Sequence, residues 1–328
     1  MAFNHMTLCL SEADIRAVLR MPDVIAAMET ALAAFSSGQV VQPVRPVVEM
    51  RDAAFFAAMP GFLRDPAVLG AKLVSVIAAN QARGLATHQA CILLLDPETG
   101  MLTAVMDGRL ITEMRTAAVS AVSAKYMARA DAGVLAILGS GVQARSHLAA
   151  LTAWRSFAEV RAWSPTAGHL HKFAAASPVP VHACASAAEA VRVADIIVLA
   201  TAAETPAIAG AWVSPGAHVI SVGACRPNQR EIDPDLVARA RVVVDSRASA
   251  FQESGDIVLG LREGRFAEDH VVAELGEVVS GKASGRTSET EVTVFKSLGL
   301  AVEDLAAAHL AYQRARGQGR GIEIEFGG

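Results

Sequence analysis

Apolar and polar positions alternate in blocks along the second part of the chain. The run 133–138, Gly-Val-Leu-Ala-Ile-Leu, is short, unbroken and bounded by glycines, which is typical of a buried strand. After it, Leu148, Leu151 and Trp154 recur at helical spacing. Further apolar runs that predict strands are 159–163, 195–200, 217–222 and, as a candidate last strand, 241–245. The alternation predicts an α/β region with a doubly wound, Rossmann-type sheet.

The first part of the chain has a mixed pattern, which predicts an α+β region. Ser11, followed by acidic residues, indicates the start of a helix, and a second helix should end at Gly38. A longer helix is expected from about 111 to 127. The strand-like stretches are 53–59, 71–77, 90–95 and 101–106, and the spacing of the last two predicts a hairpin.

The two ends of the chain have different patterns. Residues 1–6 resemble a loose leader. An amphipathic helix over about 302–314 is expected to pack back on the first region. The glycine-rich tail from Gly317 onward is expected to be mobile.

The turn after the run 133–138 has the pattern G-x-G-x-x-A. Gly139 permits a tight turn from strand to helix, Gly141 lets a pyrophosphate approach the backbone, and Ala144 lets the helix pack closely. The helix N-terminus offers N–H groups to phosphates. A dinucleotide-binding domain is the first interpretation, and an α/β domain with a chance motif is the alternative.

The choice between NADH and NADPH depends on the residues after the second strand. An acid there would bind the ribose hydroxyls of NAD, and an arginine would bind the extra phosphate of NADP. The chain has neither: Ser164 and Thr166 could hydrogen-bond either group, and Lys172 is the nearest cation. Both cofactors stay open.

Composition and charge limit the class of protein. The 328 residues have room for two domains, and the 52% apolar content supports a packed core. A net charge of -4 and a pI near 6.1 give no reason to expect nucleic acid or an anionic membrane as a partner. No window reaches the length of a membrane span, and no secretory leader is recognisable, so we expect a soluble cytoplasmic protein.

Several chemistries have no support in the sequence. The four cysteines, Cys9, Cys91, Cys184 and Cys225, are scattered, which speaks against disulfides and a zinc site. The nine histidines show no ligand spacing, so we expect no metal. A nucleophile elbow of the type G-x-S-x-G is missing as well.

Three cations in apolar surroundings are candidate functional residues. Arg45 lies between prolines, Lys72 in an apolar strand and Arg115 in an apolar helix. Burying such charges is costly unless an anion meets them, so the alternatives are internal ion pairs and a substrate carboxylate. A desolvated lysine has a lowered pKa and could act as an acid or a base. His88 opens a strand, and a single histidine in such a position more often has a structural role than a functional one.

Several blocks together resemble the ornithine cyclodeaminase/mu-crystallin family, and within it the mu-crystallin (ketimine reductase) branch. The resemblance covers roughly residues 8–312. The matching blocks are 104–108 (AVMDG), 115–121 (RTAAVSA), 138–144 (LGSGVQA), 222–227 (VGACRP), 253–256 (ESGD), 274–278 (ELGEV) and 293–304 (TVFKSLGLAVED).

The resemblance implies a homodimer with two domains and a set of site residues. The substrate-binding and dimerisation domain would comprise 1–128 with 303–328, and the NAD(P)-binding domain 129–302. Arg45, Lys72 and Arg115 would line the substrate site and carry catalysis. The residues that the resemblance places beside the cofactor are Thr87, His88, Arg115, Gly139, Gly141, Val142, Gln143, Ser164, Thr166, Thr201 and Val222.

Two departures from the ornithine-cyclising members bear on the substrate. Those members carry acids where this chain has Ala57 and Cys225, whereas mu-crystallin-like members lack both. Cys225 would still face the substrate. The resemblance therefore implies NAD(P)H-dependent reduction of a cyclic ketimine carboxylate, Δ1-pyrroline-2-carboxylate to L-proline or Δ1-piperideine-2-carboxylate to L-pipecolate. The alternatives are an alanine-type amino acid dehydrogenase, an ornithine cyclodeaminase and a non-catalytic binding protein.

Overall fold

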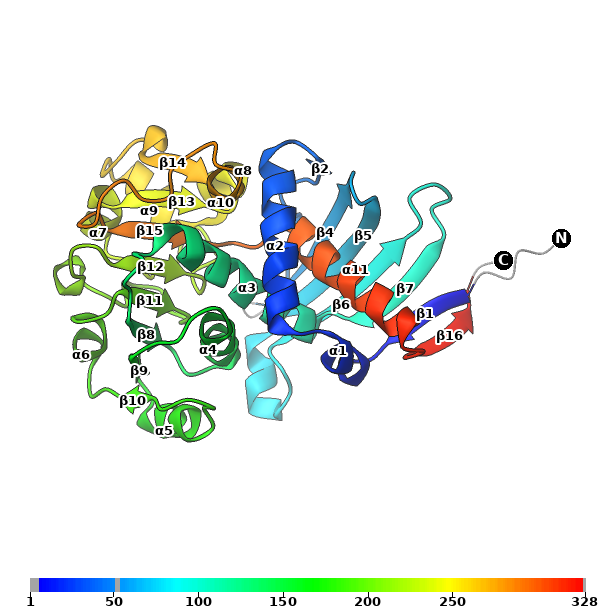
Figure 1. Cartoon of the computed structure of the whole chain (residues 1–328), viewed down its shortest axis with the longest axis horizontal. Coiled ribbons are helices and arrows are strands. Elements are labelled where there is room, and N and C mark those ends of the chain that lie inside the picture. The colour runs from blue at the N-terminus through cyan, green and yellow to red at the C-terminus, as the bar shows by residue number, and fades with distance from the viewer. Residues whose placement is uncertain (1–5, 51–53, 327–328) are drawn as a thin grey trace. The chain divides into compact units, whose positions relative to one another are not determined.

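The computed structural model describes residues 6–50 and 54–326, which form two compact units (Figure 1). The first unit contains the chain up to Arg115 together with the chain from Leu300 onward, and the second comprises Thr116–Gly299. Helix α3 (Arg109–Met127) has residues in both. The domain boundaries expected at 128/129 and 302/303 stay a prediction.

A mostly antiparallel sheet is the centre of the first unit. The strand order is β16-β1-β7-β6-β5-β4-β2, β3 pairs with β4, and β1 runs parallel to β7. The strands are β1 (Met6–Leu10), β2 (Val40–Val41), β3 (Val47–Glu49), β4 (Phe55–Leu63), β5 (Val68–Val76), β6 (His88–Leu95), β7 (Leu102–Asp107) and β16 (Ile322–Glu325). Of the predicted stretch 53–59, Ala53 lies outside the described residues.

Helices cover one face of this sheet. They are α1 (Glu12–Val18), α2 (Met21–Ser36) and α11 (Ala301–Gly317). The 3-10 helix η1 (Ala78–Arg83) lies in the connection from β5 to β6. Ser11 caps α1 through the backbone N–H of Asp14, as its sequence predicts. Helix α11 packs on β4, β5 and β6, and a Cβ on Gly70 would lie 2.9 Å from Cδ2 of Leu305. Glycine in β5 therefore allows the helix to approach the sheet closely.

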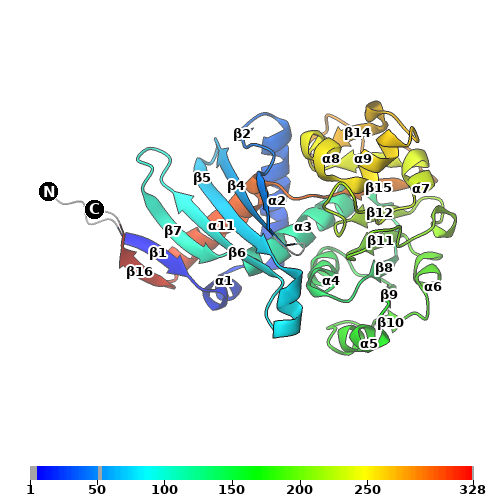
Figure 2. The same ribbon diagram turned by 180° about the vertical axis from the view of Figure 1, so that it is seen from behind.

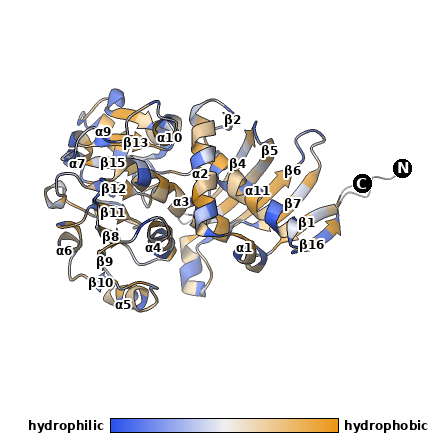
Figure 3. Cartoon of the chain, viewed as in Figure 1, coloured by the Kyte–Doolittle hydropathy of each residue, from blue (hydrophilic) through white to orange (hydrophobic). Residues whose placement is uncertain are grey.

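The opposite face of the sheet is apolar and partly exposed. Because side chains alternate along a strand, Leu73 of β5, Leu93 of β6 and Val105 of β7 point away from α11. Each is half-buried. Figure 2 shows this face with α11 behind it, and Figure 3 shows hydrophobic colours along these strands.

The second unit has a wholly parallel, doubly wound sheet, as predicted. Its order is β10-β9-β8-β11-β12-β15-β13-β14. The strands are β8 (Val134–Leu138), β9 (Glu159–Trp163), β10 (His182–Ala183), β11 (Ile196–Leu199), β12 (His218–Ser221), β13 (Arg241–Val244), β14 (Val271–Glu274) and β15 (Thr293–Lys296). The helices are α4 (Val142–Trp154), α5 (Ala167–Ala175), α6 (Ala187–Val191), α7 (Pro234–Arg239), α8 (Arg247–Glu253), α9 (Gly255–Arg262) and α10 (Leu275–Val279), with 3-10 helices η2 (Gly210–Trp212) and η3 (Glu268–His270).

Three sequence predictions about elements are wrong. Strand β13 is not the last strand, because β14 and β15 follow it and β15 inserts between β12 and β13. The tail is ordered in part, since β16 pairs antiparallel with β1. Met6 belongs to β1 rather than to a leader, and residues 1–5 lie outside the described chain. Within the described residues, no helix has the length and apolar character needed to span a membrane.

Candidate active site

Two buried cations of the first unit share one buried carboxylate. Asp304, in the first turn of α11, has Oδ2 2.5 Å from Nζ of Lys72 and accepts a hydrogen bond from Nε of Arg115 at 2.9 Å. Lys72 lies in the middle of β5, on the face that α11 covers, and exposes 2% of its surface. Asp304 exposes none. The internal ion pair that the sequence allowed for Lys72 and Arg115 is thus present.

Glu303 adds a second negative charge to this group. Its Oε2 accepts from Nη1 of Arg115 at 2.6 Å and from the backbone N–H of Leu300 at 3.2 Å. The carboxylate therefore caps the start of α11 while it binds the guanidinium. Nε and Nη1 donate to these two acids, and Nη2 donates to neither of them, so its N–H groups can meet a further anion.

The balance of burial and charge sets the protonation of the group. Burial lowers the pKa of Lys72 to about 8, an effect that Asp304 opposes and Arg115 strengthens. For Asp304, burial alone would raise the pKa, but Arg115 and Lys72 outweigh it and lower the pKa. Burial likewise opposes the charged form of Arg115, and the two acids outweigh it and raise its pKa. The pKa of Lys72 is therefore lowered, as its apolar setting predicts.

His88 and Arg45 lie within electrostatic range of this group. Burial, then the charges of Lys72 and Arg115, lower the pKa of His88 to about 4, so its imidazole is neutral at pH 7. The charge of Arg45 contributes to the lowered pKa of Lys72. Thr87 directly precedes His88, and its carbonyl accepts from the N–H of Ile77. The structure thus gathers the substrate-site candidates of the first unit around Lys72.

Sequence reasoning missed the two acids. Glu303 and Asp304 lie 188 and 189 residues from Arg115, so no local pattern connects them. A signal was present, because adjacent acids opening an otherwise alanine-rich helix are unusual in a buried position.

In the second unit, the G-x-G-x-x-A turn has the geometry that a pyrophosphate needs. Gly139 has φ +117°, and a Cβ there would lie 2.3 Å from the carbonyl oxygen of Ala200. Gly141 precedes α4, and a Cβ there would meet nothing within 4 Å. Oε1 of Gln143 is buried without a hydrogen-bond partner. Open space at Gly141 and the N–H groups of the first turn of α4 together fit a dinucleotide phosphate beside Val142.

The other predicted cofactor residues lie at the carboxyl ends of three strands. Ser164 follows β9, is buried and accepts from Oγ of Ser140 at 3.0 Å, whereas Thr166 before α5 is exposed. Thr201 follows β11, and Val222 follows β12. Cys225 lies on the loop after Val222, and its Sγ is 3.3 Å from the Val222 carbonyl oxygen. This edge is where doubly wound sheets bind their ligands.

Three side chains of the second unit form a cluster with the residue types of a metal site. His182, Cys184 and Glu189 have potential ligand atoms within 4.8 Å of one another, which the sequence did not suggest. Glu189, however, also accepts a hydrogen bond from the N–H of Ala185 and lies 3.8 Å from Arg161. Burial raises the pKa of the Cys184 thiol, which keeps the thiol protonated. These contacts disfavour a cation, and the absence of a metal stays a prediction.

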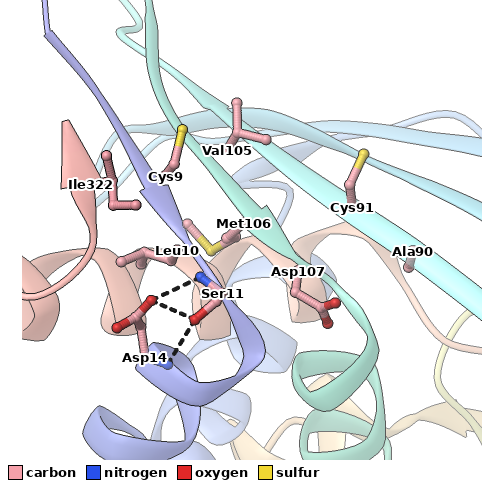
Figure 4. Close-up of a pocket in the computed structure, with 10 residues that line it drawn as sticks. All are labelled: Cys9, Leu10, Ser11, Asp14, Ala90, Cys91, Val105, Met106, Asp107 and Ile322. Atoms are coloured by element: carbon pink, nitrogen blue, oxygen red, sulfur yellow. Dashed lines mark hydrogen bonds between the residues drawn. The ribbon is translucent and has the colours of Figure 1, made fainter. Parts of the chain in front are cut away.

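A hollow of about 480 Å³ on the first unit lies apart from Lys72 (Figure 4). It is lined by side chains of β1, β6 and β7, together with Ser11 and Asp14, which cap α1. None of the predicted site residues lines it. We assign it no ligand.

Comparison with known proteins gives consistent matches over nearly the whole chain. Residues 5–319 match the ornithine cyclodeaminase/mu-crystallin family. Ketimine reductase mu-crystallin of Rattus norvegicus is 44% identical over 308 residues, 92% of this chain and 96% of that protein. The structure of Thermococcus litoralis Δ1-pyrroline-2-carboxylate reductase with NADH and L-proline has a TM-score of 0.95 at 37% identity, covering 97% and 100%. An archaeal alanine dehydrogenase dimer with bound NAD has a TM-score of 0.94 at 31% identity, covering 98% and 100%.

Proposed function

Because the chain belongs to the ornithine cyclodeaminase/mu-crystallin family, we propose that it is an NAD(P)H-dependent oxidoreductase that reduces a cyclic ketimine carboxylate. The preferred substrate is Δ1-pyrroline-2-carboxylate, reduced to L-proline, and the six-membered Δ1-piperideine-2-carboxylate, reduced to L-pipecolate, is the second. The observation that carries the proposal is the buried group of Lys72, Asp304 and Arg115.

Each residue of this group has a role in the proposal. Nη2 of Arg115, with Arg45, binds the substrate carboxylate, for which a guanidinium is well suited. Lys72, protonated below about pH 8, gives the proton that the ring nitrogen gains. Asp304 keeps Lys72 charged and oriented. The bound nicotinamide supplies the hydride that the imine carbon receives, and Thr87 and His88 are proposed to lie beside it.

The cofactor is proposed to bind the second unit through the glycine turn and three strand ends. Gly139, Gly141, Val142 and Gln143 would hold the pyrophosphate, which fits the open space at Gly141. Ser164 and Thr166 would meet the adenosine ribose, and Thr201 and Val222 the nicotinamide half. NADH and NADPH are equal candidates, because no acid or arginine follows β9.

A second copy of the chain is the proposed partner, in the cytoplasm. The similar archaeal alanine dehydrogenase is a dimer. The half-buried apolar face with Leu73, Leu93 and Val105 is the surface that a second copy would cover.

The test is a spectrophotometric screen of NADH and NADPH oxidation. The substrates are the five- and six-membered ketimines, pyruvate with ammonia or methylamine, and, for ammonia release, ornithine. We expect turnover of at least one ketimine without added ammonia and none of ornithine, since Ala57 and Cys225 replace the acids. A requirement for ammonia would favour an amino acid dehydrogenase. Ammonia release from ornithine, or no turnover at all, would overturn the proposal.

A further inference from the structure

One buried carboxylate of the second unit ties together the loops that follow β11 and β12. Oε1 of Glu231 accepts from the backbone N–H of Thr201 at 2.8 Å and from its hydroxyl at 2.7 Å. Oε2 accepts from Oγ of Ser221 at 2.9 Å and from the N–H groups of Gly223 and Ala224 at 2.8 and 3.2 Å. Five donors thus converge on one side chain that exposes no surface.

Glu231 is itself held in place from its other side. Oδ1 of Asp256 accepts from the N–H groups of Glu231 and Ile232 at 2.9 and 3.0 Å. Nζ of Lys296, in the buried strand β15, lies 3.3 Å from Oδ2 of Asp256 and donates to Oγ of Ser221 at 3.0 Å. A connected network therefore reaches from the inner strands of the sheet to its carboxyl edge.

The donors favour an ionised Glu231. Burial raises its pKa, and Lys296 and the bonds from Thr201 oppose this rise without cancelling it, while Asp256 adds to it. Three of the five partners are backbone N–H groups, which can only donate, so they favour acceptor oxygens on Glu231. The hydroxyls of Thr201 and Ser221 are placed to donate as well. A glutamine at this position would direct the N–H bonds of its amide toward backbone N–H groups, which are themselves donors.

The two loops lie in direct contact. A Cβ on Gly223 would lie 2.0 Å from the carbonyl oxygen of Thr201 and 2.3 Å from Oε1 of Glu231. Both loops stand at the carboxyl ends of adjacent parallel strands, where a doubly wound sheet presents its ligand-binding backbone. A shift of Glu231 must therefore move both loops together.

We propose that Glu231 is a positioning residue that holds the loops carrying Thr201 and Val222 in the arrangement that binds the nicotinamide half of the cofactor. The proposal rests on the proposed cofactor but is independent of the ketimine. It assigns no contact between Glu231 and the cofactor itself.

The experiment measures nucleotide affinity by titration of Glu231→Gln with NADH, NADPH and ADP-ribose, which lacks the nicotinamide. We expect the dissociation constant of the reduced cofactor that wild type binds better to rise at least tenfold, and that of ADP-ribose by less than threefold. The matched control is Asp195→Asn. Asp195 accepts from the N–H groups of Gly133 and Val134 at the opposite end of the same sheet, so neither affinity should change.

Two results would overturn the proposal. One is unchanged NADH and NADPH affinity in Glu231→Gln, and the other is an equal loss for ADP-ribose, which would indicate general damage to the unit. If that variant does not fold, Ser221→Ala removes one bond to Oε2 and keeps the carboxylate, at a residue with no proposed contact to the cofactor. A twofold to fivefold loss confined to the reduced cofactor then supports the proposal, and no loss refutes it. Wild type that binds NADH but reduces no ketimine would refute the proposed function and leave this proposal intact.

Discussion

Asp304 compensates Lys72 and, together with Glu303, Arg115 inside the first unit. A buried charge without a partner is costly, and the short contacts to Lys72 and Arg115 offset that cost. The same contacts hold both cations in fixed positions. Stability and the proposed chemistry therefore depend on one carboxylate.

We expect Asp304→Asn to destabilise the protein by about 3–5 kcal/mol, because it leaves two buried cations short of one negative charge. Urea unfolding followed by circular dichroism measures this. Glu303→Gln is the control: it removes the charge that binds Nη1 of Arg115 and leaves Asp304 in contact with Lys72. Equal stability of Asp304→Asn and wild type would contradict the role of Asp304.

The pH dependence of reduction should report Lys72. Its pKa is about 8, so the proton donor is present below that pH and is lost above it, and kcat/KM should fall as pH rises through about 8. In Asp304→Asn the charge that raises this pKa is missing, so the fall should move to lower pH. In Glu303→Gln, kcat/KM should fall at the same pH as in wild type. If the two variants have the same pH profile, the titrating group is not Lys72.

We expect Lys72→Arg to keep the ion pair but to lose about 100-fold or more in kcat, since a guanidinium does not release its proton. The fall near pH 8 should be absent from its profile. Stopped-flow absorbance of cofactor oxidation measures both. Activity within a factor of three of wild type would mean that Lys72 only positions the substrate.

At the scale of elements, the glycine turn separates two kinds of substitution. Gly141→Val should leave the free energy of unfolding within about 0.5 kcal/mol of wild type, because its side chain meets open space, yet weaken NADH binding at least tenfold. Gly139→Ala should instead lower stability by about 1–3 kcal/mol, since its φ is +117° and its Cβ would press on Ala200. Fluorescence titration and urea unfolding distinguish them, and normal NADH affinity in Gly141→Val would remove the turn from the phosphate site.

Local patterns predicted the elements that depend on local chemistry. The glycine-bounded run gave β8, and the serine cap gave α1, because both signals lie within a few residues. Strand β15 was not predicted, because it contains Lys296, whose burial depends on the distant Asp256. Strand β16 was not predicted, because its exposed Ile-Glu repeat forms a strand only by pairing with β1. The same limit applies to the site: the cations were visible, but their partners on α11 were not.

At the scale of the whole molecule, we expect a homodimer with twice the chain mass of 34.2 kDa. Leu93→Glu should shift the mass measured by light scattering toward one chain, because it places a charge on the half-buried apolar face. Val193→Glu is the control, since Val193 is 53% exposed on the second unit. A dimer that survives Leu93→Glu would place the interface elsewhere.

The return of the chain to the first unit has a consequence during synthesis. The second unit is a continuous segment, so a ribosome that has passed Gly299 has already synthesised everything that unit needs. The sheet that carries Lys72, and Arg115 on α3, must wait for α11, which brings Asp304, and the edge strand β1 must wait for β16. We expect prematurely terminated chains to hold a folded nucleotide-binding half next to an open, positively charged sheet. Such chains would expose apolar strands and leave Lys72 without its acid, which α11 brings.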